Sequence, residues 1–254
     1  MKVNITIPVY NEVEQLTASI GTLTTFVSEH CRFDPEIVIA DNGSIDGTGE
    51  LAKTLCHRHR NVHSVSLPEK GRGRALKTIW AESEADILSY MDVDLSTDLT
   101  ALPPLIEALI SGGFDLATGS RLLKPSLTTR RFHREVLSQS YNLLVKALFQ
   151  NDFSDAQCGF KAITRRAARA LLPLVEDNGW FFDTELYLYA EKAGYRIFDL
   201  PVRWVDDTDS RVRIVRTAYE DVKGLIRVKR RFLSWSASGV PVAQYKELDA
   251  AGDR

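Results

Sequence analysis

Two aspartates separated by one residue stand at the end of an apolar run and are the side chains best suited to chemistry. Asp92-Val93-Asp94 follows Asp86–Met91, whose apolar pattern predicts a strand. Two carboxylates at a strand end can bind a divalent cation that bridges phosphate oxygens, because hard cations prefer oxygen ligands. Such a cation would neutralise the charge on a departing diphosphate. Acidic pairs also end many strands as solvated turn residues, so the pair alone leaves both interpretations open.

Two other turns place glycines and polar side chains next to predicted elements. The segment Asp41–Thr48 (DNGSIDGT) closes a predicted strand, and Asp41 is a candidate to accept a hydrogen bond from a nucleotide base. The segment Lys70–Ala75 (KGRGRA) opens a predicted helix, where glycines would let an anion approach backbone N–H groups and the basic side chains would attract it. Taken singly, each segment is equally compatible with an ordinary connection.

Positive charge gathers after the fifth predicted strand. The basic residues there are Arg121, Arg130, Arg131, His133 and Arg134. Arginine binds phosphate oxygens in a bidentate fashion, and Ser138 lies one helical turn beyond Arg134 on the same face. The sequence therefore predicts a phosphate site, with a solvated basic surface as the alternative.

The elements that must position these residues alternate regularly in the first half of the chain. Strands are expected at 3–9, 36–40, 62–67, 86–91 and 114–118, and helices at 13–28, 47–59, 72–83 and 101–111. This alternation predicts an α/β fold with a mainly parallel, doubly wound sheet. Ligands bind at the carboxyl edge of such sheets, where the turns described above would meet.

The second half is less regular. We expect a loop at 124–132, helices at 134–149, 166–173 and 184–193, strands at 160–164 and 196–204, and a basic amphipathic helix at 214–232. The predicted organisation is a single domain at 1–232, with a nucleotide-sugar-binding half at 1–120 and an acceptor-binding half at 121–232. A flexible tail is expected at 233–254.

Composition excludes several other classes of protein. The 254 residues have a formal net charge of -2, with 44% hydrophobic and 26% charged residues, as is usual for a globular protein without a general attraction to nucleic acid. Three widely spaced cysteines indicate neither a zinc site nor a disulfide framework and favour a reducing compartment. No apolar run reaches the roughly 18 residues of a membrane span.

Taken together, the segments resemble family-two glycosyltransferases of the GT-A fold, specifically the dolichol-phosphate and polyprenyl-phosphate hexose synthases. The segments that carry the resemblance occur in family order and are IPVYNE (7–12), DNGSIDGT (41–48), EKGRGRAL (69–76), YMDVDLSTD (90–98), ATGSR (117–121), DAQCGFKAITR (155–165) and WFFDTELYLYA (180–190). The resemblance implies a Rossmann-like, three-layer α/β fold around a mainly parallel central sheet. It also implies inverting transfer of a hexose.

The resemblance assigns roles by position. Donor-binding residues would be Pro8, Tyr10, Glu12, Asp41, Lys70, Gly71 and Arg211. Asp92 and Asp94 would hold Mg²⁺ or Mn²⁺ and the donor diphosphate. The acceptor phosphate would be bound by Arg121, Arg131, Arg134 and Ser138, of which Arg121 and Arg134 join the two aspartates as catalytic residues. An acceptor-side motif would comprise Asp155, Gln157, Lys161, Asp183 and Glu185.

The chain departs from the family pattern at two of these motifs. Ser96 replaces the Gln that the family often has two positions after the second aspartate, which leaves a third side-chain ligand for the metal open. Asn42 replaces the commoner second aspartate of the Asp-Asp-Gly-Ser turn. The segments at 155–161 and 180–186 look more like the glucosyl branch than the mannosyl branch. UDP-glucose is therefore the first choice of donor and GDP-mannose the second.

A polyprenyl or dolichyl phosphate is the expected acceptor. A phosphate monoester carries about 1.5 to 2 negative charges near neutral pH and needs no general base. For a sugar or protein hydroxyl, the first alternative acceptor, Asp183 or Glu185 would be the candidate base. A nucleotidyltransferase is disfavoured because no glycine-rich basic loop follows the first strand. A non-catalytic nucleotide-sugar-binding protein is the remaining alternative.

The expected location is the cytoplasmic face of a membrane. The helix at 214–232 carries basic residues beside apolar ones, namely Lys223, Arg227, Lys229, Arg230 and Arg231 beside Val222, Ile226 and Phe232. Basic residues near an anionic surface contribute about 1 kcal/mol each. Peripheral contact through this helix, a helix packed on the sheet with a solvated basic side, and a separate membrane subunit are all compatible with the sequence.

Overall fold

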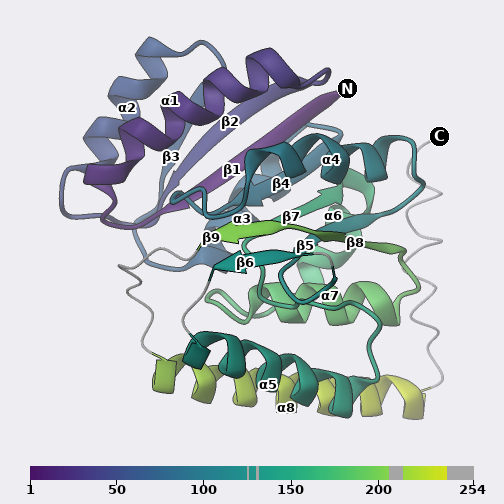
Figure 1. Ribbon diagram of the computed structural model, residues 1–254. Helices are drawn as coiled ribbons and strands as arrows, with labels where there is room; N and C mark the ends of the chain where they lie inside the picture. Colours follow the sequence, from purple (N-terminus) through teal and green to yellow (C-terminus); the bar gives the residue numbers. More distant parts are fainter. Residues whose placement is uncertain (125, 130–131, 206–213, 239–254) are drawn as a thin grey trace.

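The computed structural model describes residues 1–124, 126–129, 132–205 and 214–238, with the backbone alone at 127–129, 132–136, 214–216 and 236–238. Arg130, Arg131, Arg211 and the tail beyond Ser238 lie outside the described residues. The described chain forms an α/β fold around one seven-stranded sheet and a small two-stranded sheet (Figure 1).

The first half of the chain builds the parallel part of the large sheet. The strands are β1 (Lys2–Val9), β2 (Asp34–Asp41), β3 (Val62–Ser66) and β4 (Ile87–Met91), and they pair in the order β3-β2-β1-β4. Between them run α1 (Val13–His30), α2 (Thr48–Arg58) and α3 (Arg72–Glu82). Val3, Ile5 and Ile7 are buried, as the apolar run predicts for a strand covered on both faces. The elements predicted for this half are confirmed.

The sheet continues with strands from the second half. Here β7 (Phe160–Thr164) lies between β4 and β5 (Leu116–Ser120) and is antiparallel to both, and β8 (Ile197–Pro201) runs parallel to β5 at the edge. The predicted mainly parallel sheet is confirmed, with β7 as its antiparallel insertion. The single strand predicted at 196–204 is wrong, because the chain leaves the large sheet at Val202, and β9 (Arg203–Val205) pairs with β6 (Leu127–Thr129). A loop at 124–132 was expected where β6 forms.

Helices cover both faces of the sheet and produce three layers (Figure 1). One face packs against α1, α2 and α4 (Leu102–Ile110), which follows the short helix η1 (Leu99–Ala101). The opposite face packs against α3, α6 (Arg165–Leu171) and α7 (Phe182–Lys192), with η2 (Leu172–Leu174) between the last two. Turns at the carboxyl ends of β1, β2 and β4 meet at one edge, which we call the carboxyl edge. The expected three-layer architecture is confirmed.

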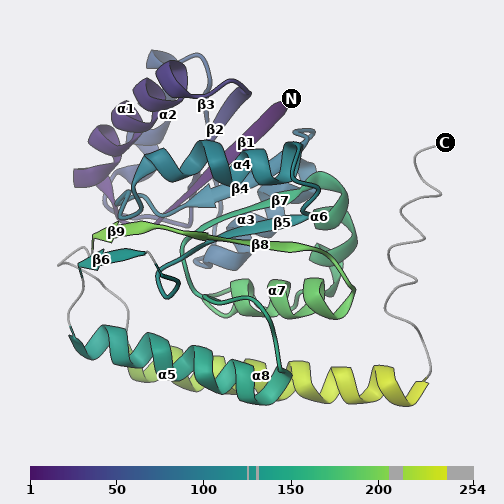
Figure 2. The same ribbon diagram turned by 45° about the vertical axis from the view of Figure 1, so that its right-hand side comes forward.

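Two long helices add a further layer below α7. The helices α5 (Phe132–Phe149) and α8 (Ile214–Ser238) lie side by side in both views (Figures 1 and 2). Phe232 contacts both Phe149 of α5 and Tyr189 of α7, and the Trp235 ring lies tilted against Tyr189 with ring centres 5.5 Å apart. These contacts carry α8 through 233–238, residues that the sequence assigned to the tail. Among the described residues, no helix carries the long apolar stretch that crossing a bilayer requires.

Candidate functional site

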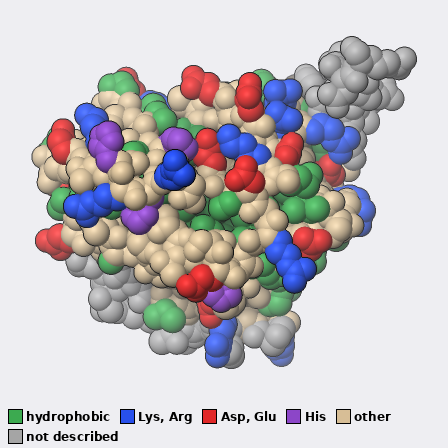
Figure 3. Space-filling view, turned by 90° about the horizontal axis from the view of Figure 1, so that it is seen from above, with side chains coloured by type: hydrophobic (Ala, Val, Ile, Leu, Met, Phe, Trp, Pro, Cys, Tyr) green, Lys and Arg blue, Asp and Glu red, His purple; other side chains and the backbone are tan. Residues whose placement is uncertain are grey.

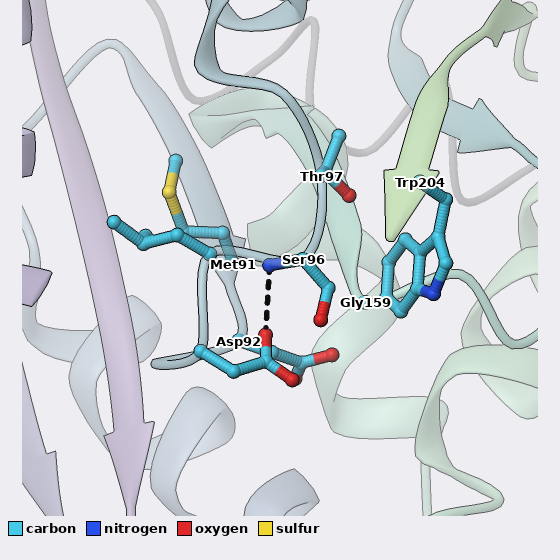
Figure 4. A pocket seen from close by; sticks show the side chains of 8 residues that line it. Met91, Asp92, Ser96, Thr97, Gly159 and Trp204 are labelled. Carbon is cyan, nitrogen blue, oxygen red and sulfur yellow. Dashed lines mark hydrogen bonds between the residues drawn. The ribbon is translucent and has the colours of Figure 1, made fainter. Parts of the chain in front are cut away.

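The two aspartates at the end of β4 border a small cavity at the carboxyl edge (Figure 4). The space between its walls, part of which is open solvent, is about 170 Å³, and the walls are Met91, Asp92, Asp94, Leu95, Ser96, Thr97, Gly159 and Trp204. The surrounding protein desolvates Asp92 and, with the negative charge of Asp94, raises the pKa of Asp92 to about 6, against the opposing charge of Arg72. A carboxylate in this setting is stabilised by any cation that binds beside it.

Gly159 fixes the position of the Asp92 carboxylate. A Cβ atom built on Gly159 would lie 1.8 Å from Oδ2 of Asp92, far inside van der Waals contact. The backbones of the two residues are also joined, since the Asp92 N–H donates to the Gly159 carbonyl at 3.2 Å. The start of β7 therefore provides a surface without a side chain, and the Asp92 carboxylate lies directly against it.

The loop after Asp94 is held firmly against β9. Ser96 N–H donates to Asp94 Oδ1 at 2.9 Å (Figure 4), and the Ser96 carbonyl accepts from Val205 N–H at 2.9 Å. Leu95 adopts a left-handed φ of 49°, an uncommon conformation for a non-glycine residue that favours a functional constraint on this loop. Ser96 contributes its backbone to this arrangement, and its side chain also lines the cavity.

The residues predicted to bind the nucleoside meet at the carboxyl ends of β1 and β2 and the start of α3. Asp41 is buried, and its Oδ1 accepts from Ser44 N–H at 3.0 Å. The Lys70 ammonium lies 3.5 Å from the centre of the Tyr10 ring. Glu12 N–H donates to Thr48 Oγ1 at 2.9 Å, and Pro8 immediately precedes this turn in β1. The structure thus brings Pro8, Tyr10, Glu12, Asp41, Lys70 and Gly71 to one edge, as the sequence predicted.

The glycines at the start of α3 permit close packing against 178–182. A Cβ on Gly71 would lie 2.5 Å from the Asn178 carbonyl, and one on Gly73 would lie 2.6 Å from Phe182 Cβ. Gly73 N–H and Arg74 N–H donate to the carbonyls of Gly179 and Asn178. The N–H groups of Gly73 and Arg74 are therefore not presented to an anion. An anion site at this helix start, with Lys70 and Gly71 as donor-binding residues, stays a prediction.

Arg121, predicted to bind the acceptor phosphate, forms a bidentate ion pair with Asp155. Its Nε and Nη2 donate to the carboxylate at 2.7 and 2.9 Å, and its guanidinium lies 5.0 Å from the Trp204 ring centre. Burial alone would raise the pKa of Asp155, but the charge and hydrogen bonds of Arg121, with the charge of Lys161, lower it to about 2. The pair joins the end of β5 to the segment before β7.

The other residues of the acceptor-side motif also make interior contacts. Lys161 is buried and donates to Thr118 Oγ1 at 2.8 Å, while Gln157 donates to Asp221 of α8 at 2.8 Å. Asp183 accepts from Tyr90 Oη at 2.6 Å and pairs with Arg72. Glu185 accepts from Asp177 N–H and Arg227, both at 2.8 Å. Because Asp183 and Glu185 are fully buried and hydrogen-bonded, their geometry disfavours a role as a general base.

The remaining acceptor residues are described only in part. Arg131 and Arg211 lie outside the described residues, and Arg134 is described as backbone in α5 alone. Ser138 is buried on α5, and its Oγ has no hydrogen-bond partner within the described residues. The predicted phosphate cluster around Arg134 therefore stays a prediction.

Four residues at the site were not identified from the sequence. Arg72 contacts Asp92, Gly159 supports it, and Thr97 and Trp204 wall the cavity. Within the described part of the chain, Thr97 Oγ1 and Trp204 Nε1 are buried without a hydrogen-bond partner. Arg72, Thr97 and Gly159 each lie inside one of the motif segments, which is the sequence signal that could have identified them. The position of Trp204 depends on the pairing of β9 with β6, which no local sequence pattern predicts.

Comparison with known families identifies the fold and the motifs. The model of glycosyl transferase family 2 matches residues 4–172. Glycosyltransferase AglD of Haloferax volcanii is 37% identical over 218 residues, which cover 85% of this chain and 35% of AglD. The chain thus spans about a third of the length of that relative. A dolichyl-phosphate beta-glucosyltransferase of Homo sapiens is 27% identical over 251 residues, covering 92% of this chain and 76% of the human protein.

A solved structure shares the architecture at lower identity. Glucosyl-3-phosphoglycerate synthase from Mycobacterium tuberculosis, crystallised with Mn²⁺, UDP-glucose and phosphoglyceric acid, matches with a TM-score of 0.67 and 18% identity. The match covers 90% of this chain and 79% of that one. This likeness establishes the GT-A-type fold.

Proposed function

Because this chain belongs to glycosyl transferase family 2, we propose that it transfers glucose from UDP-glucose to a polyprenyl or dolichyl phosphate. The observation that carries the proposal is the meeting of the candidate nucleoside residues with Asp92 and Asp94 at one edge of the sheet. Relatives named dolichyl-phosphate beta-glucosyltransferase, similar over most of the chain, support the donor sugar and the acceptor class.

Within the proposed reaction, this chain's residues bind and orient the reactants. The acceptor phosphate is already a charged nucleophile, so positioning and stabilisation of the leaving diphosphate supply most of the catalysis. The interior contacts of Asp183 and Glu185 favour this phosphate chemistry over transfer to a hydroxyl, because neither carboxylate is presented as a base. Arg134 and Ser138 on α5 are the proposed contacts of the acceptor phosphate, with Arg131 and Arg211 as further proposed cations.

A divalent cation, Mg²⁺ or Mn²⁺, fits the donor side. Asp92 and Asp94 offer hard carboxylate oxygens beside the cavity, and the pKa of Asp92 is raised by desolvation first and by the charge of Asp94 second. Among the described residues, no group of three or more His, Cys, Asp or Glu side chains is arranged to hold a metal. The diphosphate of the donor would then provide further oxygens. When bound, the cation would neutralise charge on the leaving diphosphate.

The direct test is an assay with separate donors. The purified protein is incubated with polyprenyl phosphate, Mg²⁺ or Mn²⁺, and either UDP-glucose or GDP-mannose. We expect a lipid-linked sugar with UDP-glucose, and a loss on the order of a hundred-fold in Asp94→Ala. Asp86→Ala, at the opposite end of β4, is the matched control and should keep its activity. Product with GDP-mannose alone would overturn the assignment of UDP-glucose as the donor. The absence of product with both donors would overturn the proposed function.

We further propose that the outer face of the α5–α8 layer rests on the cytoplasmic surface of an anionic bilayer. Along α8, the exposed apolar residues Tyr219, Val222, Ile226 and Leu233 form one stripe at spacings of three, four and seven. Exposed Lys223 and Arg230 flank this stripe. The neighbouring α5 exposes Leu137, Leu143 and Leu144. Apolar side chains beside cations are typical of helices that lie in a membrane interface.

Vesicle sedimentation tests this surface. We expect the protein to sediment with vesicles containing anionic lipid, and the double variant Lys223→Glu/Arg230→Glu to remain in the supernatant. The control, Lys53→Glu/Arg58→Glu on α2, makes the same change of charge on the opposite side of the molecule. There, cations and anions are interspersed on the face seen from above (Figure 3). Equal release of both variants would show that net charge, rather than this face, controls binding.

A further inference from the structure

The first residue of α3, Arg72, directs its side chain into the protein between β4 and α7. Only 10% of the side chain is exposed. Its Nη2 pairs with Asp183, its Nη1 lies 3.6 Å from Asp92 Oδ1, and its guanidinium lies 4.4 Å from the Trp180 ring centre. Burial alone would lower the pKa of Arg72, but the negative charges around it, Asp183 foremost, outweigh burial and raise the pKa. The guanidinium is therefore a positive charge held beside Asp92 and Asp183.

Local structure does not account for this arginine. A cation in the first turn of a helix opposes the helix dipole, at a cost of about 0.3 to 1 kcal/mol, and α3 has no acidic residue in that turn. The Nε of Arg72 is buried without a partner within the described residues, which adds a desolvation cost. Tight contacts of Gly71 and Gly73 with 178–182 nevertheless hold the helix start where Arg72 reaches Asp92.

The Asp92 carboxylate thus lies between Gly159 and the guanidinium of Arg72. Gly159 supports Oδ2 on one side, and the Arg72 guanidinium faces Oδ1 on the other. The guanidinium is itself fixed, because Asp183 pairs with it and Tyr90 Oη fixes Asp183 at 2.6 Å. The chain of contacts from Tyr90 through Asp183 and Arg72 ends at Asp92. Groups that orient a metal-ligating side chain tune the affinity of the site, and losing one typically weakens binding about 10- to 100-fold.

We propose that Arg72 is a positioning residue of the donor site, which orients the Asp92 carboxylate toward the divalent cation that would bind the diphosphate of the nucleotide-sugar. This inference rests on the proposed function for the identity of the donor. It gives the arginine at the start of α3 a role beside Asp92, whereas the N–H groups of Gly73 and Arg74 donate to backbone carbonyls. The alternative is that Arg72 only neutralises the buried charge of Asp183.

A pair of variants separates the two roles. Asp183→Asn removes the buried charge and leaves Arg72 beside Asp92, whereas Arg72→Gln/Asp183→Asn removes both charges. UDP binding is measured by calorimetry in the presence of Mn²⁺, and thermal unfolding verifies that each variant is folded. We expect the double variant to bind UDP about ten-fold more weakly than Asp183→Asn, in line with the loss of a group that orients a ligand. Arg74→Gln, an adjacent arginine paired with exposed Glu69, is the control and should bind as the wild type does.

Equal UDP affinity of Asp183→Asn and the double variant would overturn the inference, because Arg72 would then act only as a counter-charge. The measurement needs no lipid acceptor. If the wild-type protein binds UDP but makes no lipid-linked sugar, the proposed function fails while the comparison of variants still decides the role of Arg72. The variant Arg72→Lys gives a second readout. Because lysine is a shorter, non-planar cation, this variant should fold but retain only part of the wild-type affinity for UDP.

Discussion

Asp92 and Asp155 are both motif carboxylates, but the protein surrounds them in opposite ways. The Asp92 side chain is 31% exposed at the cavity, and desolvation with nearby negative charge raises its pKa to about 6. Asp155 is fully buried, and a bidentate arginine with Lys161 nearby lowers its pKa to about 2. The first carboxylate is partly exposed and open to a ligand, whereas the second is buried and paired with an arginine of the same chain.

This difference shows that a motif residue can serve either to bind a ligand or to hold the fold together. At the carboxyl edge, the motif supplies a partly exposed carboxylate, Asp92, that a ligand can reach. In the second half of the chain, the Asp155–Arg121 pair connects the end of β5 to the approach of β7, and Lys161 donates to Thr118 of β5. We therefore expect substitutions in the two regions to affect different quantities: binding and activity at the carboxyl edge, and folding stability at Asp155.

The largest effect is expected for Asp155→Ala. The substitution leaves the buried cations Arg121 and Lys161 without their carboxylate, and breaking a buried ion pair in this way costs about 3 to 5 kcal/mol. Since the folded pKa of Asp155 lies below its usual value, its stabilisation is present above about pH 4. It is lost as the pH falls through about 2. Urea unfolding at pH 7 measures the loss in free energy of unfolding.

Asp115→Ala provides the matched control for that loss. Asp115 is also buried, but the side chain of its partner Arg166 is 57% exposed, so water can solvate the arginine that is left behind. We expect a smaller loss of stability than for Asp155→Ala. Equal destabilisation of the two variants would show that the burial of the partner arginine does not decide the loss of stability. The comparison of the two regions would then lose its physical basis.

The next largest effect is expected for Gly159→Ala, on activity. The added methyl group would overlap Asp92 Oδ2, so the carboxylate must move away from its present position. We expect glycosyl transfer to fall about a hundred-fold, as for other losses of an oriented group, with a loss of stability of about 1 to 3 kcal/mol from overpacking. Gly21→Ala in α1 is the control, because its added Cβ meets nothing within 4 Å. Unchanged transfer in Gly159→Ala would show that the orientation of Asp92 is unimportant.

Much of the carboxyl edge was predictable because its information is local. A buried apolar run followed by a polar turn identifies the ends of β1, β2 and β4, and parallel strands bring those ends together. The role of Gly159 was not predictable in this way. It depends on the antiparallel pairing of β7 with β4, and an apolar run does not show in which direction its strand will lie in the sheet. The same limit applied to β9, which carries Trp204 into the wall of the cavity.

Charged residues were harder to interpret than strands. Arg121 and Asp155 both lie in motif segments, but their pairing joins separate elements and could not be inferred from spacing. In the same way, the basic residues at 70–75 suggested a backbone anion site, whereas the glycines beside them permit close packing against 178–182. A motif indicates that a residue type is needed at a position. Which atoms it contacts depends on the tertiary fold.

Asp221 provides the sharpest test of what a cationic partner contributes. Like Asp155 it is buried, but its Oδ2 accepts a hydrogen bond from the neutral amide of Gln157, and burial raises its pKa to about 6. The folded protein therefore holds a proton more tightly than the unfolded chain, whose aspartates titrate near 4. Between pH 4 and 6 the native state binds more protons, so this residue lowers the free energy of unfolding as the pH rises.

Asp221→Asn should consequently stabilise the protein at pH 7 by about 1 to 2 kcal/mol, and the gain should vanish toward pH 4. The amide oxygen of the new side chain can still accept from Gln157, so the substitution removes the charge without removing the hydrogen bond. Urea unfolding between pH 4 and 8 gives the difference, with the exposed neighbour Glu220→Gln as control. A gain that is independent of pH would mean that charge burial is not its cause. A loss at pH 7 would mean that the Asp221 carboxylate, despite lacking a bidentate arginine, is stabilised in the fold as Asp155 is.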